Sequence, residues 1–96
     1  MSVYFIANIT IHDPDQYQKY LEGSARVFDM FRGEYLAVDS CPLVLEGDWR
    51  HDRLVIIRFP DEMELRRWYY SAEYQELLAF RLAGARCDSL LVRGKT

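Results

Sequence analysis

The stretch "VYFIANITIHDPDQ", residues 3–16, places an alternating strand directly before a capped helix. Its β-branched and aromatic residues favour an extended conformation, and one face carries Val3, Phe5, Ala7, Ile9 and Ile11. The helix signal follows at once. Asp13 is the expected N-cap, Pro14 takes the first helical position, and Gln16 completes a capping box.

A second strand and helix follow the same plan in "RLVIIRFPDEME", residues 53–64. The apolar run predicts a buried strand, and Pro60 ends it because proline cannot donate to a sheet. Asp61 and Glu64 form another capping box. Ser71 can cap a further segment, so we expect this helix to be broken or kinked near Ser71.

The remaining chain supplies the connecting elements. The first helix is expected to stop at Gly33. Residues 34–38 and 43–49 flank "DSCP" and predict two short strands about a turn, while residues 87–94 predict the last strand. If the pair of short strands about "DSCP" is counted as one strand or hairpin, the order is βαββαβ. This order indicates an α+β fold with an antiparallel sheet and two helices on one face, the ferredoxin-like arrangement, formed by a single domain over residues 1–96.

The strands carry apolar residues on both faces, although two helices cover only one. Residues 53–59 show this most clearly, with Val55 and Ile57 on one face and Leu54 and Ile56 on the other. Leaving the second face in water would expose several aliphatic side chains. We therefore expect a homodimer that buries sheet against sheet.

Composition limits the classes of function. The 96 residues are 50% hydrophobic with a net charge of −3, which argues against nucleic-acid binding because there is no excess of basic residues to hold phosphates. No apolar run is long enough to cross a membrane, and residues 1–15 are not expected to act as a signal peptide, because they are acidic where such a peptide needs basic residues and a cleavage site. Cys41 and Cys87 have no ligand spacing, so two free thiols in a cytoplasmic protein are expected.

Four segments together resemble a known bacterial family: "IANITIHDPDQYQKY", "VLEGDWRHDRLVIIRFP", "RRWYYSAEYQELLAFRLAGA" and "DSLLVRG". They are similar to the domain-of-unknown-function-1330 family of the dimeric α+β barrel superfamily. The resemblance implies a ferredoxin-like protomer and a sheet-to-sheet dimer, but no known reaction. The chain departs from the family pattern at "VDSCP", where relatives have an arginine and paired glycines, and at Ala72, where proline is common.

An arginine interrupts the apolar face of the second helix. At helical spacing this face comprises Tyr74, Leu77, Leu78, Arg81, Leu82 and Ala85. The guanidinium of Arg81 suits a carboxylate or phenolate ligand, which it can hold with two parallel hydrogen bonds. The alternative is a structural pair with an acidic residue such as Asp88 or Glu73.

Four other residues are candidates for the same ligand site. Asn8 is a carboxamide in the middle of the first strand, which either orients a ligand or makes a cross-strand or dimer-interface hydrogen bond. Trp68, Tyr69 and Tyr74 form either an apolar wall for a planar ligand or part of the core. No catalytic residue is assigned and no metal site is found, because His12 and His51 lack partners at telling spacing.

These features favour a small dimeric protein that binds an aromatic or carboxylate ligand in a cleft between helices and sheet, lined by Asn8, Trp68, Tyr74 and Arg81. Whether it is an enzyme stays open. One alternative is a monooxygenase or isomerase that acts on a phenol or enol without any cofactor. The other is a structural or interaction domain that has no pocket.

Overall fold

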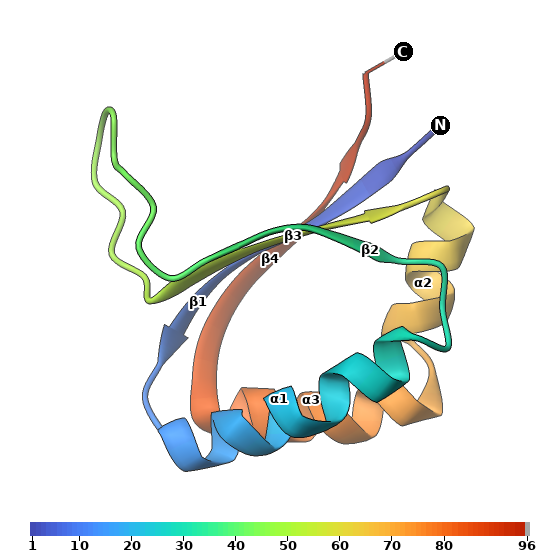
Figure 1. The fold of residues 1–96 in the computed structure, drawn as a ribbon, viewed down its shortest axis with the longest axis horizontal. Coiled ribbons are helices and arrows are strands. Elements are labelled where there is room, and N and C mark those ends of the chain that lie inside the picture. The colour runs from blue at the N-terminus through green and yellow to red at the C-terminus, as the bar shows by residue number, and fades with distance from the viewer. Residues whose placement is uncertain (96) are drawn as a thin grey trace.

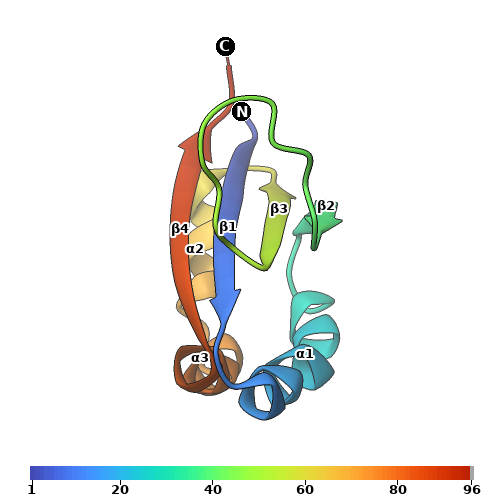
Figure 2. The ribbon, with the colours of Figure 1, turned by 90° about the vertical axis from the view of Figure 1, so that its left-hand side faces the viewer.

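The computed structural model describes residues 1–95. The elements in chain order are β1 (Val3–Ile11), α1 (Pro14–Phe28), β2 (Glu34–Asp39), β3 (Arg53–Phe59), α2 (Glu62–Tyr69), α3 (Ala72–Gly84) and β4 (Ala85–Arg93). The strands form one antiparallel sheet in the order β2-β3-β1-β4. Figure 1 shows this curved sheet arching over the helices, and Figure 2 shows it from the side. The ferredoxin-like prediction is confirmed, with the second helix divided into α2 and α3.

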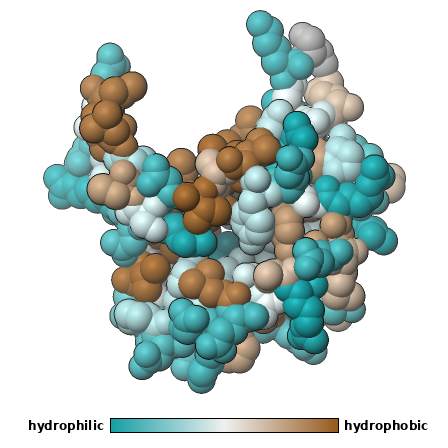
Figure 3. All heavy atoms as spheres, viewed as in Figure 1, coloured by the Kyte–Doolittle hydropathy of each residue, from teal (hydrophilic) through white to brown (hydrophobic). Residues whose placement is uncertain are grey.

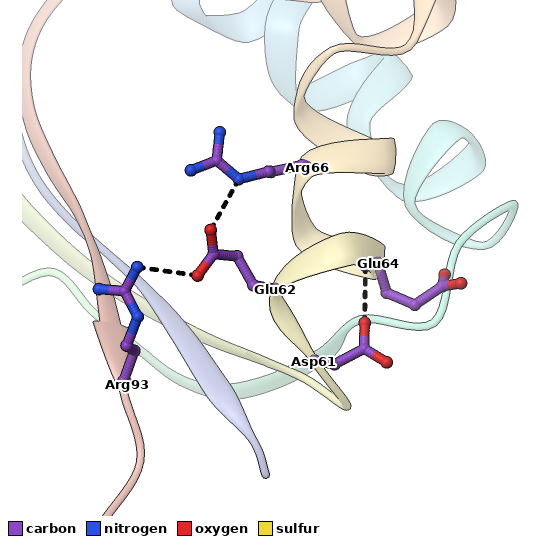
Figure 4. Close-up of polar contacts among 5 residues, drawn as sticks. All are labelled: Asp61, Glu62, Glu64, Arg66 and Arg93. Atoms are coloured by element: carbon purple, nitrogen blue, oxygen red, sulfur yellow. Dashed lines mark hydrogen bonds and ion pairs between the residues drawn. The ribbon is translucent and has the colours of Figure 1, made fainter.

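Side-chain caps start the three helices where the sequence predicted. Asp13 Oδ1 accepts a hydrogen bond from the Gln16 amide at 3.3 Å, and Asp61 Oδ1 accepts one from the Glu64 amide at 2.8 Å (Figure 4). Ser71 Oγ accepts a hydrogen bond from the amide of Tyr74, at 3.1 Å. Because Ser71 caps a new helix, the chain changes direction there, as the sequence predicted.

An ion pair on each side of Glu62 ties α2 to the edge strand β4. The carboxylate lies 2.9 Å from Arg66 Nε on the same helix and 2.8 Å from Arg93 Nη2 on β4 (Figure 4). The hydrogen bond from Arg66, followed by the charge of Arg93, lowers the pKa of Glu62. These pairs are exposed, so they fix the orientation of α2 more than they stabilise the fold.

The C-terminal end of α3 packs tightly against the start of α1 at Gly84. A Cβ atom on Gly84 would lie only 2.6 Å from the backbone nitrogen of Tyr17 and 2.9 Å from the carbonyl oxygen of Asp13. The Gly84 carbonyl accepts hydrogen bonds from the amides of His12 and Asp13, both at 2.9 Å. A glycine is therefore needed for this close approach of the two helices.

The core lies between the sheet and the helices. One face of β1 and β3 supplies the buried residues Val3, Phe5, Ala7, Ile9, Val55, Ile57 and Phe59. The helices bury Tyr17, Val27, Phe28, Leu65, Trp68, Tyr74 and Leu78 against them. Among residues 1–95, no helix has the length and apolar character that crossing a bilayer requires.

Residues 40–52 form a projecting arm, so the strand predicted at residues 43–49 is wrong. The last residue pair of β2 and β3 joins Asp39 to Leu54, and beyond it the chain has no neighbouring strand with which to pair. The arm extends away from the sheet in Figure 1, and its atoms at the upper left of Figure 3 are largely hydrophobic. Leu43 and Leu45 are 85% and 86% exposed.

The prediction for the second helix face is also wrong at one position. Leu82 was expected to face the core, but it is 65% exposed, whereas Leu78 and Arg81 on the same helix are buried. The buried stripe of α3 is narrow because α1 and the sheet cover only part of the helix.

Candidate functional site

A cavity of about 50 Å³ lies between α1 and the sheet. Its apolar walls come mainly from β1 and β3, and its polar wall residues are Tyr17, Tyr20, Ser24, Tyr35, Arg53 and Arg81. The α1 helix supplies the first three of these, while β2, β3 and α3 each supply one. Because residues distant in sequence converge there, the cavity is the strongest candidate for a ligand site.

Arg81 is the most unusual residue of this cavity, because it is charged and only 3% exposed. Its Nη1 donates to Cys87 Sγ at 3.4 Å, and its Cζ lies 5.8 Å from the ring centroid of Tyr20. The Nε atom is buried and has no hydrogen-bond partner. No aspartate or glutamate in residues 1–95 forms an ion pair with Arg81, so the predicted alternatives Asp88 and Glu73 do not hold it.

Two tyrosines, the buried Tyr74 and the half-buried Tyr20, form a hydrogen-bonded pair beside Arg81. The hydroxyl oxygens of Tyr20 and Tyr74 are 2.9 Å apart. Burial raises the pKa of Tyr74 to about 12, and burial together with Tyr74 raises the pKa of Tyr20 well above its usual value. Burial also raises the pKa of Tyr17. These phenols therefore stay neutral near pH 7 and do not compensate the positive charge of Arg81.

Arg53 is a second arginine of the cavity, and the sequence reasoning missed it. It begins β3, on the same face as the buried residues Val55 and Ile57, and its Nε atom is also buried without a partner. The signal was present in the sequence, because strand alternation places Arg53 on the apolar, core-facing side of the strand.

The structure does not bring Asn8 into this cavity. Asn8 lies on the helix-free face of the sheet, where its Oδ1 accepts a hydrogen bond from Trp49 Nε1 at 2.9 Å. The prediction that Asn8 and Arg81 line one cleft is therefore wrong, because alternation along β1 turns Asn8 away from the helices. Asn8 instead helps to anchor the arm, together with His51, whose Nδ1 is 3.0 Å from Thr10 Oγ1.

The three predicted aromatic residues lie in or beside the core, and none of them lines the cavity. Trp68 is 2% exposed, with its ring centroid 4.3 Å from that of Tyr74 and 5.1 Å from that of Phe5. Tyr69 packs at the edge of the same aromatic cluster. Tyr74 reaches the cavity indirectly, through its hydrogen bond with Tyr20. Of the five predicted ligand residues, Arg81 alone forms part of the cavity wall.

Of the other hollows at the surface, two adjoin residues that the sequence predicted for the ligand site. One of about 430 Å³ lies between the arm and the helix-free face, next to Asn8, Trp49 and Leu54. Another of about 180 Å³ lies between α2 and β4, next to Tyr69 and Leu90. Neither is lined by an arginine with an unpartnered buried nitrogen. In the described part of the chain, no three His, Cys, Asp or Glu side chains gather as a metal site requires.

Comparison with solved structures finds the same fold in several proteins. A protein of unknown function from Rhodopseudomonas palustris, RPA0582, is 17% identical with a TM-score of 0.80, covering 99% of this chain and 83% of its own. SnoaB, a cofactor-independent oxygenase from Streptomyces nogalater, is 18% identical with a TM-score of 0.70, covering 99% and 94%. At these identities the similarity concerns the fold alone.

A third structure is titled a dimeric ferredoxin-like protein of unknown function from Thermobifida fusca. It is 17% identical, with a TM-score of 0.69 over 98% of this chain and 92% of its own. The comparison with curated proteins found no match. The sequence model of the family described as "Domain of unknown function (DUF1330)" matches residues 2–95, and the protein therefore belongs to the DUF1330 family, as its sequence segments had indicated.

Proposed function

We propose that this protein binds a small organic ligand, aromatic or carboxylate, in the cavity between α1 and the sheet. The observation that carries the proposal is the position of Arg81. It is a buried charge at a cavity wall, and among residues 1–95 its Nε atom has no partner and no acidic residue pairs with it. Burying an unpaired charge is costly, so such a residue is more readily explained by a ligand than by stability.

The same observation argues against a purely structural role. A structural arginine at this position would be expected to pair with a carboxylate or to extend its head group into water. Arg81 does neither, and its neighbours are neutral hydroxyl groups and a thiol. The cavity beside it also provides space that a filled structural core would lack.

The cavity is less suited to catalysis by proton transfer. A general base works best with a pKa near the working pH. The ionisable residues that line the cavity are three tyrosines with raised pKa values and two arginines, with no histidine or carboxylate. The likeness to a cofactor-independent oxygenase keeps catalysis as a second candidate, in which Arg81 would stabilise an enolate or phenolate.

A ligand screen with a blocked cavity tests the binding proposal. Phenols, lactones and small carboxylic acids are titrated into isotope-labelled protein and followed by NMR. We expect at least one compound to shift the signals of Tyr17 and Tyr20. Ser24→Leu, which fills the cavity without changing its charge, should abolish the shifts, and Gln18→Leu on the exposed side of α1 should retain them.

The proposal fails if every compound leaves these signals unchanged in the native protein. It also fails if Ser24→Leu binds the same compounds equally well, because the ligand would then lie elsewhere. The hollow between the arm and the sheet would become the next candidate.

We also propose that the protein is a homodimer whose sheets face each other. On the helix-free side, Leu90 and Val92 are 61% and 38% exposed, and apolar residues of the arm adjoin the same face at Asn8 and Leu54. A face and an arm that are both apolar can cover the same surfaces of a second copy. The dimeric state named for the Thermobifida fusca protein supports this assembly.

Replacing Leu90 by glutamate is expected to separate the dimer. The variant places one glutamate from each copy in the interface. Burying these two like charges is expected to weaken the contact about tenfold or more. Sedimentation velocity should show a lower mass for Leu90→Glu than for the native protein. Leu82→Glu is a matched control, because Leu82 is 65% exposed on the helical side. A native protein that sediments as a monomer would contradict the proposal.

Two further proposals concern the cell rather than the site. We propose a cytoplasmic location, which the unbridged Cys41 and Cys87 support. We also propose that nucleic acid is not a partner, and the net charge of −3 supports this.

A further inference from the structure

Two arginines that line one cavity each have a buried nitrogen without a hydrogen-bond partner. Arg53 on β3 and Arg81 on α3 both line it, and each has a buried Nε atom without a hydrogen-bond partner. No carboxylate within residues 1–95 pairs with either guanidinium. The arginines that do form ion pairs all lie at the surface: Arg50, Arg58, Arg66, Arg67 and Arg93.

The sheet register relates the positions of these two arginines through Ile9 on β1. Ile9 on β1 lies between Arg53 on β3 and Cys87 on β4 in the same cross-strand row. Since adjacent strands are roughly 4.8 Å apart, the backbones of Arg53 and Cys87 are about 10 Å apart. Arg81 Nη1 lies 3.4 Å from Cys87 Sγ at one end of this row, Arg53 lies at the other end, and both arginines line the same cavity.

The charge of this cavity is therefore positive, although the chain as a whole is negative. Both positive charges contribute to the Coulomb interactions that lower the pKa of Tyr17, opposing the stronger effect of its burial. The remaining polar groups are neutral hydroxyls that can donate hydrogen bonds. An anionic group would satisfy the free nitrogens and compensate the charge at the same time.

The size of the cavity limits what this anion can be. About 50 Å³ has room for a few water molecules, whereas pockets for drug-sized ligands measure about 300 to 1,000 Å³. The walls beyond the arginines are aliphatic and phenolic, without lysine or a helix N-terminus to support a phosphate group. A planar carboxylate fits the fork geometry of guanidinium and brings a small apolar group with it.

We propose that the cavity binds a small organic acid, with its carboxylate held between the guanidiniums of Arg53 and Arg81. This inference rests on the proposed ligand-binding function and gives it a substrate class. Arg81 forms the rigid side of the clamp, because its stem is fully buried. Arg53, which is half-buried, forms the side nearer to water.

The test compares acids with their uncharged amides. Acetate, butyrate and benzoate are titrated into the full-length protein by calorimetry, in parallel with acetamide, butyramide and benzamide, and inorganic phosphate is a separate titrant. We expect at least one acid to bind about tenfold or more tightly than its amide, because the amide lacks the charge that both arginines recognise. Phosphate should bind more weakly than that acid.

Variants of the two arginines test the clamp itself. Arg53→Met and Arg81→Met should each weaken binding of the acid about tenfold or more. Arg53→Lys and Arg81→Lys keep the positive charge and serve as controls for misfolding of the methionine variants. They should bind the acid better than the methionine variants but less tightly than native protein, because lysine lacks the forked geometry of guanidinium. Arg66→Met, at an exposed ion pair on α2, should bind as the native protein does.

The outcomes separate the two levels of the proposal. If amides bind as tightly as acids and Ser24→Leu blocks them, the cavity binds ligands but the acid class is wrong. If phosphate binds more tightly than every acid, the carboxylate assignment is wrong. If Arg53→Met binds the acid normally while Arg81→Met does not, there is no clamp. If neither acids nor amides bind, both this inference and the proposed function fail.

Discussion

Replacing Trp68 by alanine is expected to lower the free energy of unfolding by about 3 to 5 kcal/mol, the usual cost of removing a large aromatic side chain from a core. Trp68 is 2% exposed, and its ring lies within 5.3 Å, centroid to centroid, of the rings of Phe5, Phe59 and Tyr74. The cavity left by alanine would open at the centre of this cluster. Urea denaturation at a fixed protein concentration measures the change.

Tyr70 provides the matched control for Trp68. It lies two residues later and is 67% exposed, so Tyr70→Ala should change the free energy of unfolding by no more than about 0.5 kcal/mol. The sequence left open whether Trp68 belongs to the core or to a ligand site. A stable Trp68→Ala protein that no longer binds the acid would assign Trp68 to the ligand site and contradict our interpretation of the core.

Replacing Arg81 by methionine is expected to raise the free energy of unfolding, by about 1 to 4 kcal/mol, while it weakens ligand binding. Methionine keeps the apolar volume of the side chain and removes a buried charge that has no acidic partner. Tyr20 and Tyr74 retain their mutual hydrogen bond in this variant. A binding residue such as Arg81 that lowers the stability of the fold is common at functional sites.

The same urea measurements test this second expectation, with Arg66→Met as the exposed control. Arg66 pairs with Glu62 at the surface, so its replacement should change the stability by less than about 1 kcal/mol. A loss of about 3 to 5 kcal/mol in Arg81→Met would contradict the expectation, because that is the cost of breaking a satisfied buried pair. Arg81 would then have a structural partner.

Most of the secondary structure could be predicted because its signals are local. The caps at Asp13, Asp61 and Ser71 act on amides three residues away, so short motifs were enough to place three helix starts. The arm could not be predicted in this way. Its residues have strand-like composition, but pairing depends on a neighbouring strand, and none lies beside residues 43–49.

The candidate site was predicted in part. Arg81 was found because it interrupts an apolar helical face, and that pattern reports burial directly. Arg53 carried the same kind of signal on β3 and was overlooked. Asn8 was placed in the wrong cleft, although alternation along β1 already separated it from Phe5 and Ala7.

Apart from residues 40–52, the sequence by itself determined the order of elements, the two-sided apolar sheet and the family, because caps, alternation and segment resemblance depend on nearby residues. Only the tertiary structure decided that Arg53 and Arg81 share a cavity, that Trp68 is enclosed by aromatic rings and that no carboxylate of the described residues pairs with the two arginines. Those facts depend on the register of β3, β1 and β4 and on where α3 lies against them. Contacts between residues far apart in the chain are set by packing, which no local pattern encodes.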